Sequence, residues 1–440
     1  MSAHVPALPL EADPLIAEAK RRARRRRLIA AAFVTALAVG GLAAAGVLSG
    51  RSTAPRSSLA PVVDARAFRG HGNLAFVSRG RLWLLDGSTG TLVRAAAGGA
   101  SSPTFSPNGR WLAWSQGPRF GIARADGTGS QLAAAHGSAP AWLPDGRLLV
   151  GRAIYRIENG LPTRTATAPR GLVSWAADGS RYAFVETRLD GRRHPPDNDV
   201  ERVEVSRSLN GPRRVWYETP ESFTTRSGWE DPAVGPVAIL PRAGILIWLD
   251  PFHSASIAAD GLAVYAIRSP LARPRKLGVT LGRQLSLAPG GRFALGAGGD
   301  RIAWTNKQVV TCTLDGCRPF RSRGRMTLDP AWSPDGRTLA YVTGSNLGVD
   351  MSGIAPTVGR WYATRRLWIG HDAVPGSSGA ASPVWSSDGR SLLFVAHDGL
   401  WLLPQLGERP VRVAEPLFRP GRWPNYYGQV DWADRFAWHS

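Results

Sequence analysis

Cysteine, lysine and methionine are scarce in this chain. It has two cysteines and three methionines, and lysine occurs only at Lys20, Lys276 and Lys307. Two cysteines exclude a disulfide-scaffolded mini-protein and a four-cysteine zinc site, and because the first is Cys312, a lipid-modified amino-terminal cysteine is excluded too. The net charge of +21 comes from arginines dispersed along the chain, which fits an arginine-rich composition, so we predict no nucleic-acid binding.

Signatures of catalysis are also missing. The sequence has no G-x-S-x-G nucleophile turn, no H-x-x-x-H pair and no S-x-D-x-G-x-x-W sialidase box. We therefore predict a protein that is not an enzyme and needs no cofactor. One candidate metal site remains: Asp197, Asp199 and Glu201 stand at alternate positions along the chain and could hold Ca²⁺. The alternative is a solvated acidic loop, because the glycine and terminal glutamate of an EF-hand loop are absent.

The amino-terminal part of the chain predicts a membrane anchor. Residues 28–48 contain no charge, and a helix of that length spans about 30 Å, the thickness of a bilayer core. The basic run KRRARRRR at 20–27 precedes it, so the positive-inside rule places residues 1–27 in the cytoplasm as a basic tail and the rest outside the cell membrane. The alternative is a cleaved signal peptide. Residues 49–65, rich in Ser, Pro and Ala, are predicted to be a flexible tether.

From residue 66 to residue 440 the chain repeats one pattern. An apolar residue or proline and an aromatic residue precede a four-residue turn, and a short alternating strand follows it. The units stand at 102–114, 138–151, 171–185, 235–249, 283–296, 328–342 and 382–395. A second pattern, predicted to be the third strand of each unit, occurs at 79–86, 260–267, 365–372 and 398–404. A repeat of about 45 residues with four short strands is typical of β-propeller blades.

The chemistry of the turn explains the repeat. In the unit at 328–342, Pro334 presets φ near −65°, Asp335 accepts the next turn position and Gly336 supplies a left-handed residue. The other turn glycines are Gly109, Gly146, Gly179, Gly244, Gly291 and Gly389. A tryptophan recurs in one motif position at 142, 175, 332 and 385, which indicates packing between blades.

We predict an all-β propeller of eight four-stranded blades, with seven as the alternative, preceded by the single transmembrane helix. Seven motif units and the strands of 73–97 make eight blades, but the blade at 73–97 lacks a first strand. The carboxyl-terminal segment 428–439 resembles a motif strand. It is expected to complete that blade and close the ring, because closure removes exposed sheet edges.

The P-x-W-S-P-D-G-R-x-L-A-Y units resemble the repeats of TolB-type, WD-repeat-like propellers. The resemblance covers about residues 70–440, and it is strongest at 328–342 and 382–395. It implies the architecture and a bacterial envelope setting, whereas such propellers carry many functions. TolB itself has a further amino-terminal domain where this chain has its predicted anchor, so TolB's own partners are not carried over.

Long connections are predicted to gather on one face of the ring. Turns between first and second strands are short, whereas 188–200, 218–235, 250–259, 343–364 and 415–427 join strands on the opposite face. Exposed aromatic side chains on loops of a rigid scaffold indicate recognition, and the alternative is that they plug the channel mouth. The candidate partner-binding residues are Phe223, Trp229, Phe252, His253, Trp361, Tyr362, Trp423, Tyr426 and Tyr427.

Cys312 and Cys317 flank Thr-Leu-Asp-Gly. If these four residues turn a hairpin, the two cysteines meet across it and form a disulfide that persists outside the cytoplasm. The alternative is a pair of free buried thiols.

Three functions remain compatible with these observations. The preferred one is a membrane-tethered extracytoplasmic scaffold that binds an envelope protein or a cell-wall glycan. The second is a single-pass sensor that signals through a cytoplasmic partner, and the third is a propeller hydrolase or lactonase.

Overall fold

The structure is a computed structural model. It describes residues 60–134, 139–188, 200–220, 223–225, 228–230, 233–241, 243–250, 262–280, 284–298, 307–320, 325–345, 362–417 and 432–440. The tail 1–27 and the predicted membrane segment 28–48 lie outside these residues. Within the described ranges, no helix is long and apolar enough to span a membrane.

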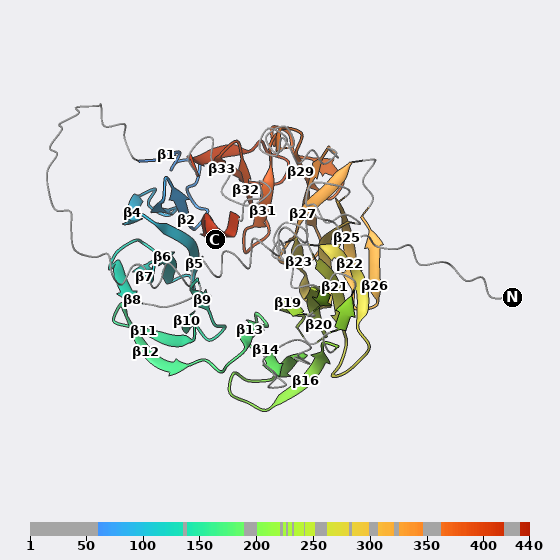
Figure 1. Ribbon diagram of the computed structural model, residues 1–440. Helices are drawn as coiled ribbons and strands as arrows, with labels where there is room; N and C mark the ends of the chain where they lie inside the picture. The colour runs from blue at the N-terminus through green and yellow to red at the C-terminus, as the bar shows by residue number, and fades with distance from the viewer. Residues whose placement is uncertain are drawn as a thin grey trace.

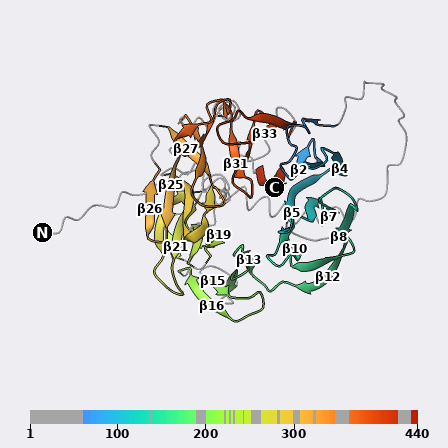
Figure 2. The same ribbon diagram turned by 180° about the vertical axis from the view of Figure 1, so that it is seen from behind.

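Eight antiparallel sheets surround a central axis, which confirms the predicted eight-bladed propeller (Figure 1). Figure 2 shows the same ring from behind. The first, innermost strands of blades 1 to 8 are β35 (Phe436–His439), β5 (Ala100–Phe105), β9 (Ala141–Trp142), β13 (Leu172–Trp175), β19 (Ala233–Ile239), β23 (Leu285–Leu287), β27 (Met326–Trp332) and β31 (Ala381–Trp385). The second strands are β2 (Asn73–Ser78), β6 (Trp111–Gln116), β10 (Leu148–Val150), β14 (Tyr182–Arg188), β20 (Ile245–Asp250), β24 (Phe293–Gly298), β28 (Leu339–Gly344) and β32 (Leu392–Ala396).

The outer half of each blade follows the same order. The third strands are β3 (Arg81–Asp86), β7 (Arg119–Arg124), β11 (Ala153–Glu158), β15 (Val200–Ser206), β21 (Leu262–Ile267), β25 (Lys307–Thr313), β29 (Arg366–Ile369) and β33 (Gly399–Leu403). The fourth strands are β4 (Leu92–Ala96), β8 (Gln131–Ala134), β12 (Leu161–Thr167), β16 (Arg213–Glu218), β22 (Arg275–Thr280), β26 (Gly316–Pro319), β30 (Asp372–Ala373) and β34 (Val411–Glu415). The remaining elements are β1 (Val62–Val63), the hairpin of β17 (Phe223–Thr225) and β18 (Gly228–Glu230), and two 3-10 turns at Pro289–Gly291 and Trp432–Asp434.

The carboxyl-terminal strand closes the ring, as the sequence predicts. β35 pairs with β2 in the register Phe436↔Phe76 to His439↔Asn73, so blade 1 is built from both ends of the propeller. A second closure was not foreseen. Val62 and Val63, at the end of the predicted tether, pair with Glu415 and Ala414 and add a fifth strand to blade 8.

The core is divided into eight apolar clusters, one at each interface between neighbouring blades, within the described residues. The four motif tryptophans, at 142, 175, 332 and 385, all pack in these clusters. Two of them also bond to the preceding blade, because the Trp142 Nε1 donates to Thr104 O (3.1 Å) and the Trp385 Nε1 donates to Ala331 O (2.9 Å). The repeated tryptophan is therefore a blade-to-blade packing residue.

The repeated turn has the expected conformation in the well-formed units. Gly336 has φ 66°, and its N–H donates to Ser333 O at 2.8 Å. The Asp335 carboxylate accepts the Ser333 hydroxyl (2.5 Å) and the Arg337 N–H (2.9 Å), which holds the pKa of Asp335 below its usual range. Gly244 is an exception, because its φ is not positive. A Cβ there would meet Ile267 O at 2.1 Å, so close backbone approach is what requires glycine.

Candidate functional site

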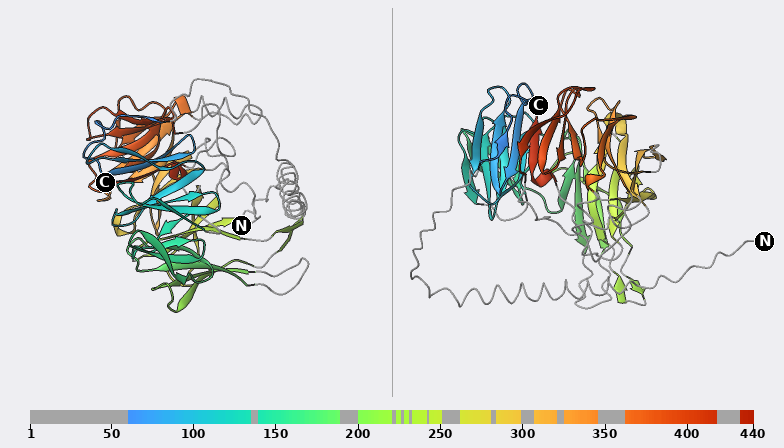
Figure 3. Two further views of the ribbon diagram at one scale, coloured as in Figure 1. Left: turned by 90° about the vertical axis from the view of Figure 1, so that its left-hand side faces the viewer. Right: turned by 90° about the horizontal axis from the view of Figure 1, so that it is seen from above.

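Strand order divides the connections between two faces. In each blade the first-to-second and third-to-fourth turns share one face, here called the turn face. The second-to-third and blade-to-blade connections share the other, the long-loop face. Figure 3 shows the ring from the side, with the β17–β18 hairpin (green) standing apart from the blades on the long-loop face.

Long second-to-third connections are confined to four consecutive blades. In blades 8, 1, 2 and 3 only two residues link the second and third strands, at 397–398, 79–80, 117–118 and 151–152. Positive φ values at Arg79 and Gly80, and at His397 and Asp398, are those of tight hairpin turns. In blades 4 to 7 the corresponding links are 189–199, 251–261, 299–306 and 345–365. The long second-to-third links are thus grouped in one half of the ring, and the blade-to-blade connection between β34 and β35, residues 416–435, is a further long connection between blades 8 and 1.

Six of the predicted recognition residues lie outside the described residues, namely Phe252, His253, Trp361, Trp423, Tyr426 and Tyr427. Phe223 and Trp229 belong to the β17–β18 hairpin, where the backbone alone is described. Phe223 pairs with Glu230, and Trp229 pairs with Thr224.

Tyr362 is the one predicted recognition residue whose side chain is described. It is half-buried and packs against the clusters that join blades 7, 8 and 1. The Arg365 guanidinium lies over its ring, 4.7 Å from the ring centroid. Tyr362 therefore packs onto the blades, as the plug alternative expects for this residue.

A buried ion pair lies beside Tyr362 and was not foreseen. Arg365 is 2% exposed and pairs with Asp329, which is 13% exposed. The Asp329 carboxylate also accepts the Ser382 N–H (3.0 Å) and the side-chain amide of Gln284, whose carbonyl accepts Asp329 N–H at 2.6 Å. The network ties blades 6, 7 and 8 together at the innermost strands.

Electrostatics keep Asp329 charged. Burial alone would raise the pKa of its carboxyl group, but the Arg365 charge and the hydrogen bonds from Ser382 and Gln284 outweigh it and lower the pKa below the usual range.

Asp329 has φ 49°, and Ser102 and Ser382 share this left-handed conformation at the equivalent positions, each just before a proline. The sequence feature that could have pointed to this network is Asp329 itself, which stands where the other two repeats have serine.

The predicted calcium ligands are only partly described. Asp197 and Asp199 lie outside the described residues. Glu201 is in β15, and its carboxylate accepts the Val234 N–H of the next blade, which gives this side chain a contact between blades 4 and 5. Within the described ranges, no group of three metal-ligating residues occurs.

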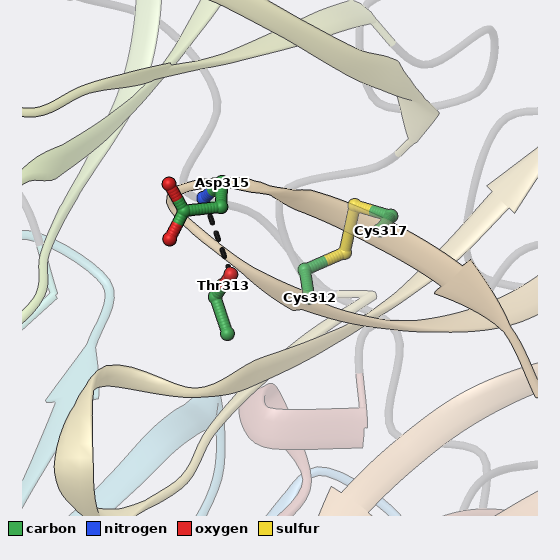
Figure 4. The surroundings of a disulfide bond; sticks show 4 residues. All are labelled: Cys312, Thr313, Asp315 and Cys317. Atoms are coloured by element: carbon green, nitrogen blue, oxygen red, sulfur yellow. Dashed lines mark hydrogen bonds between the residues drawn. A yellow bond between two sulfur atoms is a disulfide. The ribbon is translucent and has the colours of Figure 1, made fainter.

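Cys312 and Cys317 form a disulfide across the β25–β26 hairpin of blade 6 (Figure 4). The two residues are paired directly in the sheet, with a Cα–Cα distance of 4.1 Å. The Asp315 N–H donates to Thr313 Oγ1 at 3.1 Å and tightens the turn. The bridge therefore clamps a third-to-fourth turn on the turn face.

A cavity of about 300 Å³ lies on the turn face between blades 1 and 2, lined by Gly70, Gly72, Asn73, Asp86, Ser88 and Asp126. Its two carboxylates already cap their own turns. Asp86 accepts the Ser88 N–H (2.7 Å) and Asp126 accepts the Thr128 N–H (2.8 Å), and hydrogen bonds from Thr128 lower the pKa of Asp126. This assigns both aspartates a structural role.

No protein-family model and no curated protein matches the chain. Similar solved structures include a crystal structure of the eukaryotic initiation factor, with 12% identity, TM-score 0.44, 78% of this chain covered and 95% of that one. Another is the β-propeller domain of the Trilobed protease from Pyrococcus furiosus, with 11% identity, TM-score 0.38 and coverage of 68% and 93%. A third is Porphyromonas gingivalis dipeptidyl peptidase 4, with 12% identity, TM-score 0.37 and coverage of 77% and 49%. At these identities and TM-scores the likeness does not extend to function.

Proposed function

We propose that this chain is a TolB-type envelope propeller, held at the membrane by residues 28–48, whose long-loop face binds an envelope protein or a cell-wall glycan without catalysing a reaction. The observation that carries the proposal is the grouping of the long second-to-third connections on blades 4 to 7. Ring closure and inter-blade packing need only the two-residue links found in the other four blades. Additional chain on one half of one face is therefore available for recognition.

The division of roles follows from the packing. Tyr362 supports the channel end of the face together with the Arg365–Asp329 pair. Recognition is assigned to the aromatic residues of the connections, among them Trp229 on the β17–β18 hairpin, which stands apart from the blades (Figure 3). Tryptophan suits this role because it buries a large area with few rotatable bonds.

Site-specific photo-crosslinking in native membranes tests the assignment. A photoreactive residue at Trp229 or Trp361 should give a discrete adduct that excess unlabelled protein competes away. The same residue at Arg337 or Arg390, exposed on the turn face, should give none. Binding to purified sacculi distinguishes a glycan from a protein partner. Equal adducts from both faces, or adducts from the turn face alone, would refute the proposal.

A further inference from the structure

Three carboxylates of blade 4 are committed to ion pairs within the blade. Arg213 pairs with Glu186 and Glu204, and Arg202 pairs with Glu218. These pairs neutralise one side of the blade. Arg214, on the side of the blade that faces blade 5, has no such partner among the described residues.

Four exposed cations stand where blades 4 and 5 meet: Arg214 on β16, Arg273 in the turn before β22, and Arg275 and Lys276 on β22. We call them the basic rim. No carboxylate among the described residues pairs with any of them within 4 Å. The nearby cation Arg268 does have a partner, Asp315 on the disulfide hairpin.

Sheet register places two of the four on one interface, and a backbone hydrogen bond places a third there. Arg214 is directly opposite Val205, a member of the cluster between blades 4 and 5, so it lies on the side of its sheet that faces blade 5. Lys276 is opposite Tyr265, which packs against the same cluster from blade 5. The turn that carries Arg273 leans on blade 4, because the Leu271 N–H donates to Trp216 O at 3.2 Å.

The fourth member extends the surface toward blade 6. A Cβ on Gly316 would lie 2.9 Å from Arg275 Nη2, so this guanidinium rests on the tip of the disulfide hairpin. Beneath the rim, Arg181 adds a further positive charge. Its guanidinium donates to main-chain oxygens, among them Ala243 O at 2.9 Å, and lies over the Trp216 ring, 5.7 Å from the centroid.

Two prolines stiffen the turn that carries Arg273, and the rim is open. Pro270 and Pro274 fix φ on either side of Arg273, which lowers the entropy lost when the turn binds a ligand. The cations are spread along two outer strands rather than converging on an enclosed pocket. Guanidinium groups bind phosphate oxygens in a bidentate manner, so the arrangement suits a chain of phosphates better than a single small anion.

We propose that the basic rim binds an extended polymer with a repeating phosphate backbone other than a nucleic acid, of the kind represented by inorganic polyphosphate. A bilayer surface fits less well, because Leu271, 68% exposed, is the one large apolar side chain in this turn that faces solvent. The rim involves residues of the turn face and outer strands, so it is independent of the aromatic residues on the long-loop face.

Binding of fluorescent inorganic polyphosphate to the full chain in neutral detergent tests the inference. The variant R214Q/R273Q/R275Q/K276Q should bind at least tenfold more weakly at low salt, and the slope of log affinity against log salt should become shallower. The control R66Q/R94Q/R110Q/R119Q removes four exposed arginines of blades 1 and 2 and should change affinity less than threefold. Thermal melting checks that both variants are folded.

Three results would overturn the inference. Equal losses in the two variants would mean that affinity follows net charge, and no loss in the rim variant would mean that polyphosphate binds elsewhere or not at all. A third arm uses vesicles containing anionic phospholipid. Rim-dependent binding to vesicles without rim-dependent binding to polyphosphate would identify a lipid surface instead and contradict the proposal.

Discussion

The Trp438 Nε1 donates a hydrogen bond to the carbonyl oxygen of His71, 2.6 Å away and 367 residues earlier in the chain. This contact locks the carboxyl-terminal strand into the blade that begins the propeller. Ser440 joins the carboxyl terminus to blade 8 as well, because its hydroxyl accepts the Ser387 N–H at 2.7 Å. The stability of the whole ring therefore depends on the last strand.

Deletion of residues 428–440 should open the ring. Blade 1 would lose its innermost strand, and the unpaired edge of β2 would favour aggregation, so we expect insoluble protein or a large fall in melting temperature. The matched control deletes residues 60–63, which removes only β1, the added outer strand of blade 8. That variant should melt close to the full chain. Similar melting of the two variants would show that closure depends on something else.

Replacing one partner of the Arg365–Asp329 pair should strongly destabilise the protein. Arg365→Met leaves a buried carboxylate without its cation, and the expected loss is about 3–5 kcal/mol. Asp329→Asn should cost less with Arg365→Met present than alone, because the double variant buries no charge. Denaturant unfolding of the two single variants and the double variant measures the coupling. Additive losses would contradict the description of this pair as an interacting unit.

Acidification should weaken the ring closure through His71. Its Nδ1 lies 3.2 Å from Ser391 Oγ, and burial lowers its pKa although Asp388 and Glu408 act to raise it. Below about pH 6.5 the unfolded chain binds this proton more readily than the folded chain. Stability is therefore complete above that pH and falls as the pH drops through the lower folded pKa. The melting temperature of His71→Gln should change less over this range than that of the parent, and parallel profiles would exclude His71 as the cause.

Removal of the disulfide should have a modest effect. The bridge closes a loop of about six residues, so its contribution through chain entropy is about 2 kcal/mol. Cys312→Ser/Cys317→Ser should melt a few degrees lower and retain the fold. Free thiols that react with a membrane-impermeant reagent in the native, unreduced protein would contradict the bridge.

The sequence predicts the architecture well because the architecture is local and repeated. Turns such as those at Gly109, Gly336 and Gly389 mark the end of the first strand and the start of the second in seven blades, and the strands of 73–97 add the eighth. The closing strand was predictable because 428–439 resembles the missing first strand.

Contacts between segments that are far apart in the sequence could not be predicted from the sequence. Nothing local marks Val62–Val63 as a strand, because its pairing partner lies in β34. In the sequence Glu201 belongs to an acidic stretch, yet its carboxylate accepts a hydrogen bond from the backbone of the next blade. Asp329 and Arg365 belong to the same blade but are separated by the long connection between β28 and β29, so their charges meet only when the sheet of blade 7 is formed.

The most direct test of the account is a paired measurement on one triple variant, Trp229→Ala/Trp361→Ala/Trp423→Ala. Its binding to the crosslinked partner, or to sacculi, should be lost while its melting temperature stays within a few degrees of the parent. The control Trp332→Ala removes a ring that packs between blades 6 and 7 under Arg292, and it should cost about 3–5 kcal/mol of stability while the folded fraction still binds. A triple variant that unfolds while its folded remainder binds normally would identify the three tryptophans as structural plugs and contradict recognition on the long-loop face.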